Sequence, residues 1–438
     1  MRQQAEIVPV KLLGPAQFTS PLDLSTAEGD GVGNFVSEDS YIRHRVEIRT
    51  DITDENDLLF EKAGPREKLF FDPTDTRVAM VTCGGLCPGL NNVIRSAFLE
   101  LHYNYGVSDV LGFRYGYKGL NPAHELASVL LTSELVERID KQGGTILGTS
   151  RGQEPLDIMA DTLERERINV LLCVGGDGTQ HGAHRLHQEL DRRGAKIAVV
   201  GVPKTVDNDI HYCSVTFGYE TAIDAAREVL QFAHNEARSA LNGIALVKVM
   251  GRDAGFIAAG AALASQEVNF ALIPEVPFKL EGAGGFLNAL RERILARRHA
   301  VIVVAEGSGQ ELFEDYRGER DASGNVRYHD IGLHLKHAIN NYFDEQKIPI
   351  DLKYIDPSYI LRSAPANCFD GLLCNQLARR AVHAAMAGRT DVMIGYWNRA
   401  FMHVPIPMAT EAKKQLDPEG ELWTSVLAAT GQARCYAN

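Results

Sequence analysis

One stretch of the chain, Asn169 to Asp209, limits the folds open to it more than any other part. An apolar run of strand length, 170–174, ends in the glycine turn 175–179 (GGDGT), and a helical pattern follows at once. A second apolar run, 197–202, ends in the polar turn 203–209 (PKTVDND). This order is typical of an open parallel sheet, in which both turns lie at the carboxyl ends of strands, where ligands bind.

The glycine turn has the chemistry of a phosphate site. Gly176 and Gly178 have no Cβ, so backbone N–H groups there can approach a phosphate, and the helix N-terminus adds a partial positive charge. Asp177 is poorly suited to hold phosphate directly, but it suits an Mg²⁺ ion that bridges phosphate oxygens. The turn therefore predicts a site for magnesium and phosphate.

The polar turn brings together four side chains with complementary chemistry: Lys204, Thr205, Asp207 and Asp209. Such a set can neutralise a phosphate, orient a substrate and accept a proton. For either turn alone, an ordinary polar surface turn is an equal alternative. Two such turns at successive strand ends favour a functional site.

Composition sets broader limits. The chain has 438 residues, which suggests two or three domains or one large bilobal unit, and its 45% hydrophobic content suffices for a substantial core. Its net charge of -12 and the lack of a Lys/Arg tract disfavour nonspecific nucleic-acid binding. A local basic pocket for a phosphorylated substrate remains compatible with this charge.

The sequence also indicates a compartment. The longest apolar run, about 256–264, is too short to cross a membrane, and the first residues (MRQQAEIVPV) lack a long apolar segment. The seven cysteines are scattered, with no Cys-x-x-Cys pair to start a zinc site. We expect a cytoplasmic protein with reduced thiols that binds no membrane.

A third glycine turn, 84–89, follows the apolar run 77–83 and precedes a helical pattern that starts at Asn91. Taken alone, it is a weak signal for phosphate binding, because glycine turns also serve packing. Residues 1–75 show no strong periodicity and read as an extension that packs on the main body or on a neighbouring subunit. Within it, residues 40–49 alternate as an edge strand or hairpin arm would.

Together these motifs resemble the 6-phosphofructokinase family. GGDGT alone is shared with NAD kinases and diacylglycerol kinases, but PKTVDND is much more specific. Further matches follow in family order and cover about residues 77–408: TCGGLCPG, GFRYGYKGL, GGTILGTSR, MGRDAG and KYIDPSYILR. The last segment is similar to the enzymes of plants, spirochaetes and kinetoplastids rather than to the regulated bacterial ones.

The resemblance implies an α/β fold with two similar Rossmann-like, doubly wound domains, an active site in the cleft between them, and an N-terminal extension. The implied boundaries are 1–75 for the extension, 76–218 with 363–410 for the nucleotide domain, and 219–362 with 411–438 for the sugar-phosphate domain. A homodimer or homotetramer is also implied.

The resemblance assigns roles residue by residue. Phosphoryl transfer from Mg-ATP to the 1-hydroxyl of fructose 6-phosphate would use Asp207 as general base, with Arg252, Lys204 and Thr205 as further catalytic residues. The nucleotide would be bound by Gly85, Tyr117, Arg151, Gly152, Gly176, Asp177, Gly178 and Thr179. The sugar phosphate would be bound by Thr205, Val206, Asp207, Met250, Gly251, Arg252, Glu306, Lys353, Tyr359, Ile360, Leu361 and Arg362. Asp177 and Asp209 would hold Mg²⁺.

Gly178 and Lys204 indicate different phosphoryl donors. Pyrophosphate-dependent members commonly carry an aspartate where Gly178 stands, so Gly178 favours ATP. Lys204 is common in pyrophosphate-dependent members, whereas bacterial ATP-dependent enzymes have glycine there. Plant-like and kinetoplastid ATP enzymes combine this glycine with this lysine, so we predict ATP and keep a pyrophosphate-dependent phosphotransferase as the alternative.

Other predictions concern regulation and metals. A catalytically silent regulatory subunit or metabolite sensor on the same fold is an alternative of another class, which the intact Asp207, Asp177 and Arg252 disfavour. Control by the bacterial effectors is doubtful, because only Arg95 of their basic residues is kept and Leu99 takes the place of the next. The histidines at 181, 184 and 187 have helical spacing, and we expect a solvated helix face rather than a metal site.

Overall fold

The computed structural model describes residues 5–47, 57–313 and 326–437. The chain divides into two compact units, each assembled from separate segments. Unit 1 comprises Met1–Thr205, Ile210–Gly218 and Pro365–Ala412, and unit 2 comprises Val206–Asp209, Tyr219–Ala364 and Lys413–Asn438.

Unit 1 is built on a seven-stranded sheet with the order β18-β17-β11-β10-β7-β8-β9. The five inner strands are parallel, and β18 and β9 run antiparallel at the two edges. The strands are β7 (Arg77–Thr82), β8 (Asp109–Phe113), β9 (Val129–Leu130), β10 (Val170–Gly175), β11 (Ala198–Pro203), β17 (Val392–Trp397) and β18 (Ala400–Pro405). The two apolar runs that opened the sequence analysis are thus neighbouring parallel strands, β10 and β11, as predicted.

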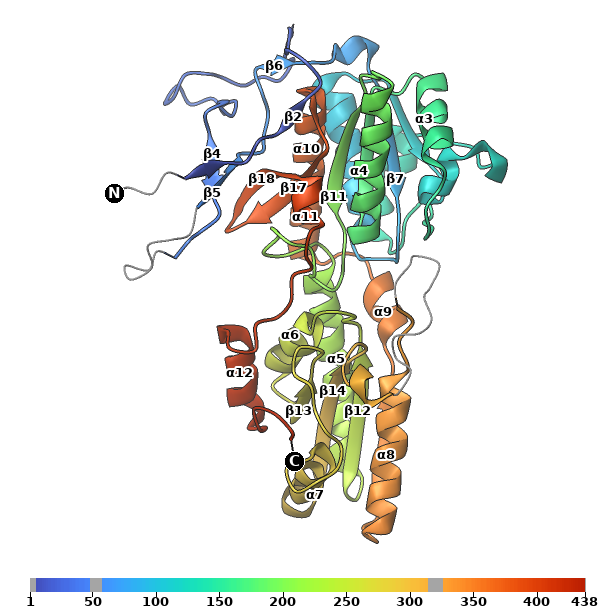
Figure 1. The fold of residues 1–438 in the computed structure, drawn as a ribbon, viewed down its shortest axis with the longest axis vertical. Coiled ribbons are helices and arrows are strands. Elements are labelled where there is room, and N and C mark those ends of the chain that lie inside the picture. Colours follow the sequence, from blue (N-terminus) through green and yellow to red (C-terminus); the bar gives the residue numbers. More distant parts are fainter. Residues whose placement is uncertain (1–4, 48–56, 314–325, 438) are drawn as a thin grey trace. The chain divides into compact units, whose positions relative to one another are not determined.

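Helices cover both faces of this sheet (Figure 1). Helix α4 packs on β10 and β11 together with α3 and α11, whereas α10 and α1 pack together on the other face. The main helices are α1 (Leu90–Leu99), α2 (Ser133–Val136), α3 (Leu156–Arg165), α4 (Asp177–Arg192), α10 (Cys368–Met386) and α11 (Ile406–Ala409). Because both faces are covered, β7, β10 and β11 are almost wholly apolar rather than alternating.

The N-terminal segment belongs to unit 1. Its strands are short and join into small sheets: β1 (Glu6–Ile7), β2 (Lys11–Leu12), β3 (Phe18–Thr19), β4 (Tyr41–Arg43), β5 (Leu58–Glu61) and β6 (Lys68–Leu69). The predicted strand at 40–49 is the three-residue β4, paired antiparallel with β5, and residues 48 and 49 lie outside the described part. Strand β2 pairs with β16 (Arg389–Thr390), so the segment packs on the body of its own unit.

Unit 2 contains a four-stranded parallel sheet with the order β13-β14-β12-β15. Helix α5 packs on β12, β14 and β15, and α6 packs on β13 and β14. Helix α7 packs on β14, and α8 packs on β12 and β15. The elements are α5 (Tyr219–Ser239), β12 (Gly243–Val249), α6 (Phe256–Ser265), β13 (Phe270–Leu272), α7 (Phe286–Arg297), β14 (His299–Ala305), α8 (Ile331–Glu345), β15 (Asp351–Ile355), α9 (Ser358–Ser363) and α12 (Glu421–Thr430). A buried cluster around Leu246, Phe286 and Ile302 forms its core.

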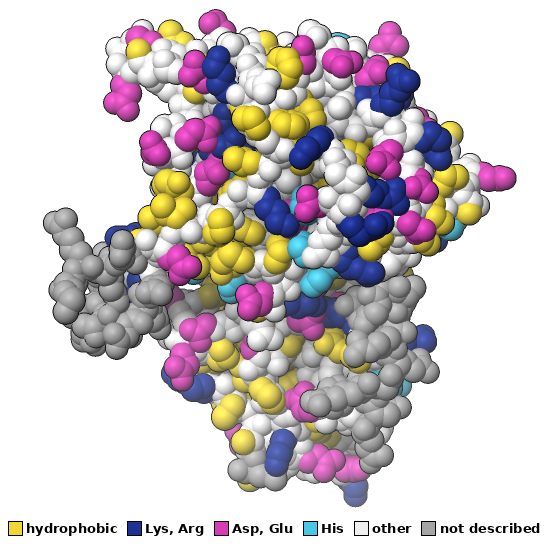
Figure 2. Space-filling view, turned by 45° about the horizontal axis from the view of Figure 1, so that its top comes forward, with side chains coloured by type: hydrophobic (Ala, Val, Ile, Leu, Met, Phe, Trp, Pro, Cys, Tyr) yellow, Lys and Arg dark blue, Asp and Glu magenta, His cyan; other side chains and the backbone are white. Residues whose placement is uncertain are grey.

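The α/β architecture with parallel sheets agrees with the predicted fold class. Residues 311–327, whose charged and glycine-bearing sequence is typical of a surface insertion, lie mostly outside the described residues. Among the helices that the structure describes, none combines the length and the apolar character needed to span a bilayer. Figure 2 shows both basic and acidic side chains on one face of the molecule.

Candidate active site

Two glycine turns meet at one edge of the unit 1 sheet. Strands β7 and β10 are parallel neighbours, so the turns that follow them lie side by side. The backbone N–H of Cys83 donates to the carbonyl oxygen of Val174 over 2.9 Å, which ties the two strand ends together. Gly84 and Gly89 have φ values of 86° and 101°, a conformation that favours glycine.

The second turn places the N-terminus of α4 at this edge, with Gly176 as the residue before the helix. The N–H of Thr179 donates to the carbonyl oxygen of Gly176 over 2.9 Å, and its side chain is buried against Gly175. The N–H groups of Asp177 and Gly178 belong to the first turn, where no intrahelical partner is available. They are therefore the donors that this helix can offer to an anion.

Gly178 is exposed, and a Cβ added there would meet no atom within 4 Å. Its φ does not require glycine either. The packing of unit 1 thus does not explain why this position lacks a side chain. By contrast, a Cβ at Gly175 would stand 2.2 Å from the Thr179 hydroxyl, so that glycine serves packing.

Arg151 and Tyr117 take different positions beside these turns. Arg151 is exposed, and its Nη2 lies 3.5 Å from the point where a Cβ of Gly85 would stand. Gly152 follows with a φ of 103°. Tyr117 is only 3% exposed, and its hydroxyl donates to the carbonyl oxygen of Thr179 over 2.7 Å. The ring therefore supports the backbone of the α4 N-terminus from inside the protein.

Lys204 follows β11 and is only 5% exposed. Its ammonium donates to the carbonyl oxygen of Gly85 over 2.8 Å. The lysine, which follows β11, thus reaches past β10 to the glycine turn that follows β7. The carbonyl oxygen of Thr205 accepts a hydrogen bond from the Thr216 hydroxyl over 2.7 Å. Lys204 and Gly85 were predicted separately, and the structure brings them into contact.

The next residues of the same turn belong to unit 2. Desolvation raises the pKa of Asp207 well above its ordinary value, and the carboxylates of Asp209 and Glu306 raise it further, against a hydrogen bond from the Arg252 backbone. Asn208 adopts a φ of 58°, and its side-chain oxygen accepts a hydrogen bond from Lys414 over 2.9 Å. Asp207 therefore binds a proton more readily than an exposed carboxylate does.

The ends of β12 and β14 carry the other charged groups of unit 2. The N–H of Glu306 donates to Val249 and that of Gly307 to Gly251, each over 3.0 Å, so the two strand ends stay in register. Burial raises the pKa of Glu306, and the positive charge of Arg252 opposes this shift. The Arg252 guanidinium stacks over the Tyr328 ring at 4.4 Å from its centroid, a contact that the sequence motifs did not indicate. Val206 and Met250 are buried, at 8% and 7% exposure.

The segment predicted to bind the sugar phosphate divides into exposed and buried residues. Arg362 stacks over the ring of Tyr359 at 4.5 Å, and Tyr359 is 74% exposed. The N–H groups of Ile360 and Leu361 both donate to the carbonyl oxygen of Pro357, and Leu361 is fully buried. Only Tyr359 and Arg362 therefore present polar groups to a ligand among these four residues.

Lys353 has a partner of its own. It lies within β15, and its ammonium forms an ion pair with Asp351 at 2.9 Å. Another lysine, Lys248, was missed by the sequence reasoning and forms ion pairs with Asp330 at 2.9 Å and with Asp356 at 3.0 Å. The sequence signal that could have identified Lys248 is its position as a charged residue inside the apolar strand β12.

The three histidines of α4 do not form one solvated face, so that prediction was wrong in part. His181 is exposed, but His187 is 3% exposed and hydrogen-bonds the Thr390 hydroxyl over 3.1 Å. His184 lies 2.9 Å from the carboxylate of Asp391. Within the described ranges, no three His, Cys, Asp or Glu side chains gather as a metal site. Magnesium sites often use only one or two carboxylates plus substrate phosphates, and Asp177 at a helix N-terminus fits that chemistry.

The two sheets, the glycine turns and the charged strand ends define a phosphate-transferring α/β protein, and the chain belongs to the phosphofructokinase family, whose model matches residues 77–385. Every predicted site residue lies within that range. The chain is 48% identical over 429 residues to the ATP-dependent 6-phosphofructokinase of Borreliella burgdorferi, with 96% of this chain and 95% of that protein covered. It is 44% identical over 436 residues to the protein of the same name from Amycolatopsis methanolica, with 97% and 94% covered.

Solved structures agree on the fold. The crystal structure of a pyrophosphate-dependent phosphofructokinase from Marinobacter aquaeolei matches with a TM-score of 0.67, over 81% of this chain and 91% of that chain. At 18% identity this likeness concerns the fold alone.

Proposed function

We propose that the protein transfers a phosphoryl group from Mg-ATP to the 1-hydroxyl of fructose 6-phosphate, giving fructose 1,6-bisphosphate and ADP. The observation that carries the proposal is the environment of Asp207, a carboxylate with a raised pKa beside Arg252 and Glu306. A hydroxyl nucleophile must lose its proton as it attacks phosphorus, and a carboxylate of this kind is a suitable acceptor.

The other roles follow from the contacts in each unit. In unit 1, the N–H groups of Asp177 and Gly178, with Arg151, would hold the donor phosphates, and the buried Lys204 would offset their charge. In unit 2, Glu306 would accept hydrogen bonds from sugar hydroxyls, and Arg362 with Tyr359 would bind the 6-phosphate.

Magnesium would be held by Asp177, with Asp209 as the second carboxylate. When bound, the ion supplies neutralisation of charge on the phosphate oxygens. The protein's own contribution is to orient the two substrates, to keep Lys204 beside the glycine turns, and to accept the proton at Asp207.

ATP is the proposed donor because Gly178 leaves open space where a side chain would crowd the nucleotide. The relatives at 44–48% identity carry the same donor in their names. The pyrophosphate-dependent structure shares only the fold at 18% identity, so it does not favour the alternative donor.

We further propose that the protein works in the cytoplasm as a homodimer or homotetramer. None of the seven cysteines, all of which lie in the described residues, forms a disulfide, and five of them are buried, as expected in a reducing compartment. Exposed apolar side chains at Ile360 and Phe232 would suit a subunit contact.

The test measures initial rates with fructose 6-phosphate and Mg²⁺, with ATP and pyrophosphate each as the sole donor. Turnover with ATP alone is expected. Turnover with pyrophosphate alone would reverse the donor assignment, and activity with neither would favour the silent-subunit alternative. Asp207→Ser should lower turnover by a factor of about 10² to 10⁴. Asp224→Ser, which removes an exposed carboxylate of α5, is the matched control.

A further inference from the structure

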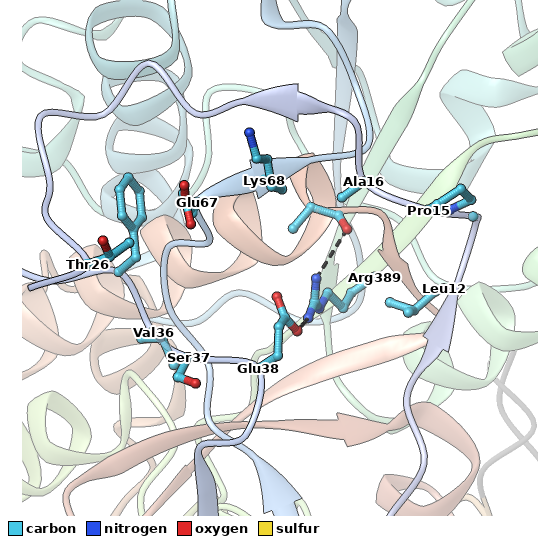
Figure 3. A pocket seen from close by; sticks show the side chains of 13 residues that line it. Leu12, Pro15, Ala16, Thr26, Val36, Ser37, Glu38, Glu67, Lys68 and Arg389 are labelled. Atoms are coloured by element: carbon cyan, nitrogen blue, oxygen red, sulfur yellow. Dashed lines mark hydrogen bonds and ion pairs between the residues drawn. The ribbon is translucent and has the colours of Figure 1, made fainter.

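A cavity of about 680 Å³ lies in unit 1, where the N-terminal segment meets the residues that follow α10. Its wall combines the apolar side chains of Leu12, Pro15, Phe35 and Val36 with the charged groups of Glu38 and Arg389 (Figure 3). All the residues that line it lie outside the range 77–385 matched by the family model. None of the residues predicted to bind the nucleotide or the sugar phosphate lines this cavity.

Arg389, which lines the cavity, belongs to an ionic cluster with Arg66 and Glu61. Arg389 is 4% exposed and Arg66 is 1% exposed. Both donate to the same carboxylate oxygen of Glu61, Arg66 over 2.6 Å and Arg389 over 3.0 Å. His403 Nδ1 lies 3.2 Å from the same oxygen, and burial lowers the pKa of His403 against the opposing effect of Glu61. One carboxylate, with a side chain that is 12% exposed, thus faces two buried guanidinium groups.

Glu38 supplies the second negative charge, but from the surface. Its carboxylate pairs with Arg389 and lies 3.6 Å from Arg66 Nε, while the Glu38 side chain is 66% exposed. In Figure 3, the Glu38 side chain reaches into the cavity and meets Arg389 there. When Glu38 moves into solvent, the cluster retains one excess positive charge that faces a partly apolar cavity.

We propose that this cavity is a binding site for a small metabolite with an oxyanion, carboxylate or phosphate, attached to an apolar portion. The oxyanion takes the place of the Glu38 carboxylate on Arg389, because the guanidinium fork suits both groups. The apolar portion packs against Phe35, Val36 and Leu12. The site does not depend on the catalytic assignment, since it shares no residue with it.

The test uses two probes with the same ring, benzoate for a carboxylate and phenyl phosphate for a phosphate. Calorimetric titrations on the full chain at constant ionic strength give their dissociation constants. Glu38→Gln removes the internal competitor and should tighten binding of at least one probe about tenfold, the effect of one charge-assisted hydrogen bond. Glu67→Gln is the matched control: Glu67 lines the same cavity, and among the described residues it forms no ion pair with Arg389.

Arg389→Gln should weaken the same binding at least about tenfold. If that variant does not fold, the comparison of Glu38→Gln with Glu67→Gln still decides, because both change exposed carboxylates. Equal affinities in these two variants would overturn the proposal, as would the absence of binding by both probes. Tightening for benzoate alone would identify a carboxylate ligand, and tightening for phenyl phosphate alone a phosphate ligand.

Discussion

The open space at Gly178 leads to the sharpest test of donor choice, the substitution Gly178→Asp. No atom lies within 4 Å of the added Cβ, so the fold should accept the new side chain. An aspartate in the first turn of a helix gains from the helix dipole and from a better helix propensity than glycine. We expect the free energy of unfolding to stay unchanged or to rise by up to about 1 kcal/mol.

The effect of Gly178→Asp on catalysis with ATP should be larger than its effect on stability. A carboxylate about 4 Å from a phosphate costs about 4 kcal/mol at an effective dielectric constant of 20. Position 178 is exposed, and discounting for solvent leaves about 3 kcal/mol, or roughly a hundredfold in kcat/KM for ATP. The KM for fructose 6-phosphate should change little, because its proposed ligands are in unit 2.

A coupled assay of ADP release measures the ATP dependence, and urea unfolding measures stability. Gly178→Ala separates bulk from charge and should lower kcat/KM for ATP by less than about tenfold. ATP turnover within threefold of the parent in the aspartate variant would refute the donor argument. A large loss of stability in that variant would refute the claim that packing tolerates a side chain at position 178.

Three further outcomes are expected. Asp207→Asn should lower turnover about 10² to 10⁴-fold, yet the variant should unfold at a higher urea concentration near pH 8. The pKa of Asp207 is raised in the native state, so its ionised carboxylate destabilises that state at any pH above the pKa that Asp207 has in the unfolded chain. Lower stability of the variant would contradict this argument. Arg362→Gln should raise KM for fructose 6-phosphate at least about tenfold in steady-state rates, whereas Lys353→Gln, whose ammonium already pairs with Asp351, should have a smaller effect; the reverse order would assign the phosphate to Lys353. Burial lowers the pKa of His383 to about 3, so the unfolded state binds more protons than the native state between pH 6.5 and 3. The free energy of unfolding should therefore decrease as the pH is lowered through that window, by up to about 1.4 kcal/mol per pH unit. In urea unfolding at pH 7 and 5, His383→Gln should make this decrease smaller.

The sequence predicted the parts of the site that depend on strand order. Turns that follow apolar runs fall at the carboxyl edge of a parallel sheet, and the glycine turns after β7 and β10 do lie together there. The contact of Lys204 with Gly85 was out of reach, because it depends on which strands are neighbours and on the reach of a flexible side chain.

Side-chain direction was a second limit. Motif spacing could not show that the side chains of Tyr117, Thr179 and Leu361 are buried inside the protein. The prediction that His187 is solvated was wrong for a related reason. Helical spacing gives the face of a helix on which a residue lies, and only the tertiary structure shows that β16 covers this face at His187. Apart from the alternation at 40–49, the N-terminal segment carried no strong periodic signal, because its strands are two to four residues long. Its charged cluster joins positions far apart in the sequence.

The interrupted path of the chain through unit 1 has a consequence for synthesis on the ribosome. Strand β11 ends at Pro203, but its neighbour β17 starts only at Val392, after nearly all of unit 2. At 5–20 residues per second, roughly 10–40 s pass between the two. During that interval the emerging sheet has a bare apolar edge at β11, and all four strands of unit 2, the last of which ends at Ile355, are synthesised before β17. The nascent chain thus exposes a strand edge open to wrong pairing, and a holding chaperone would act on β11 before release of the C-terminal segment.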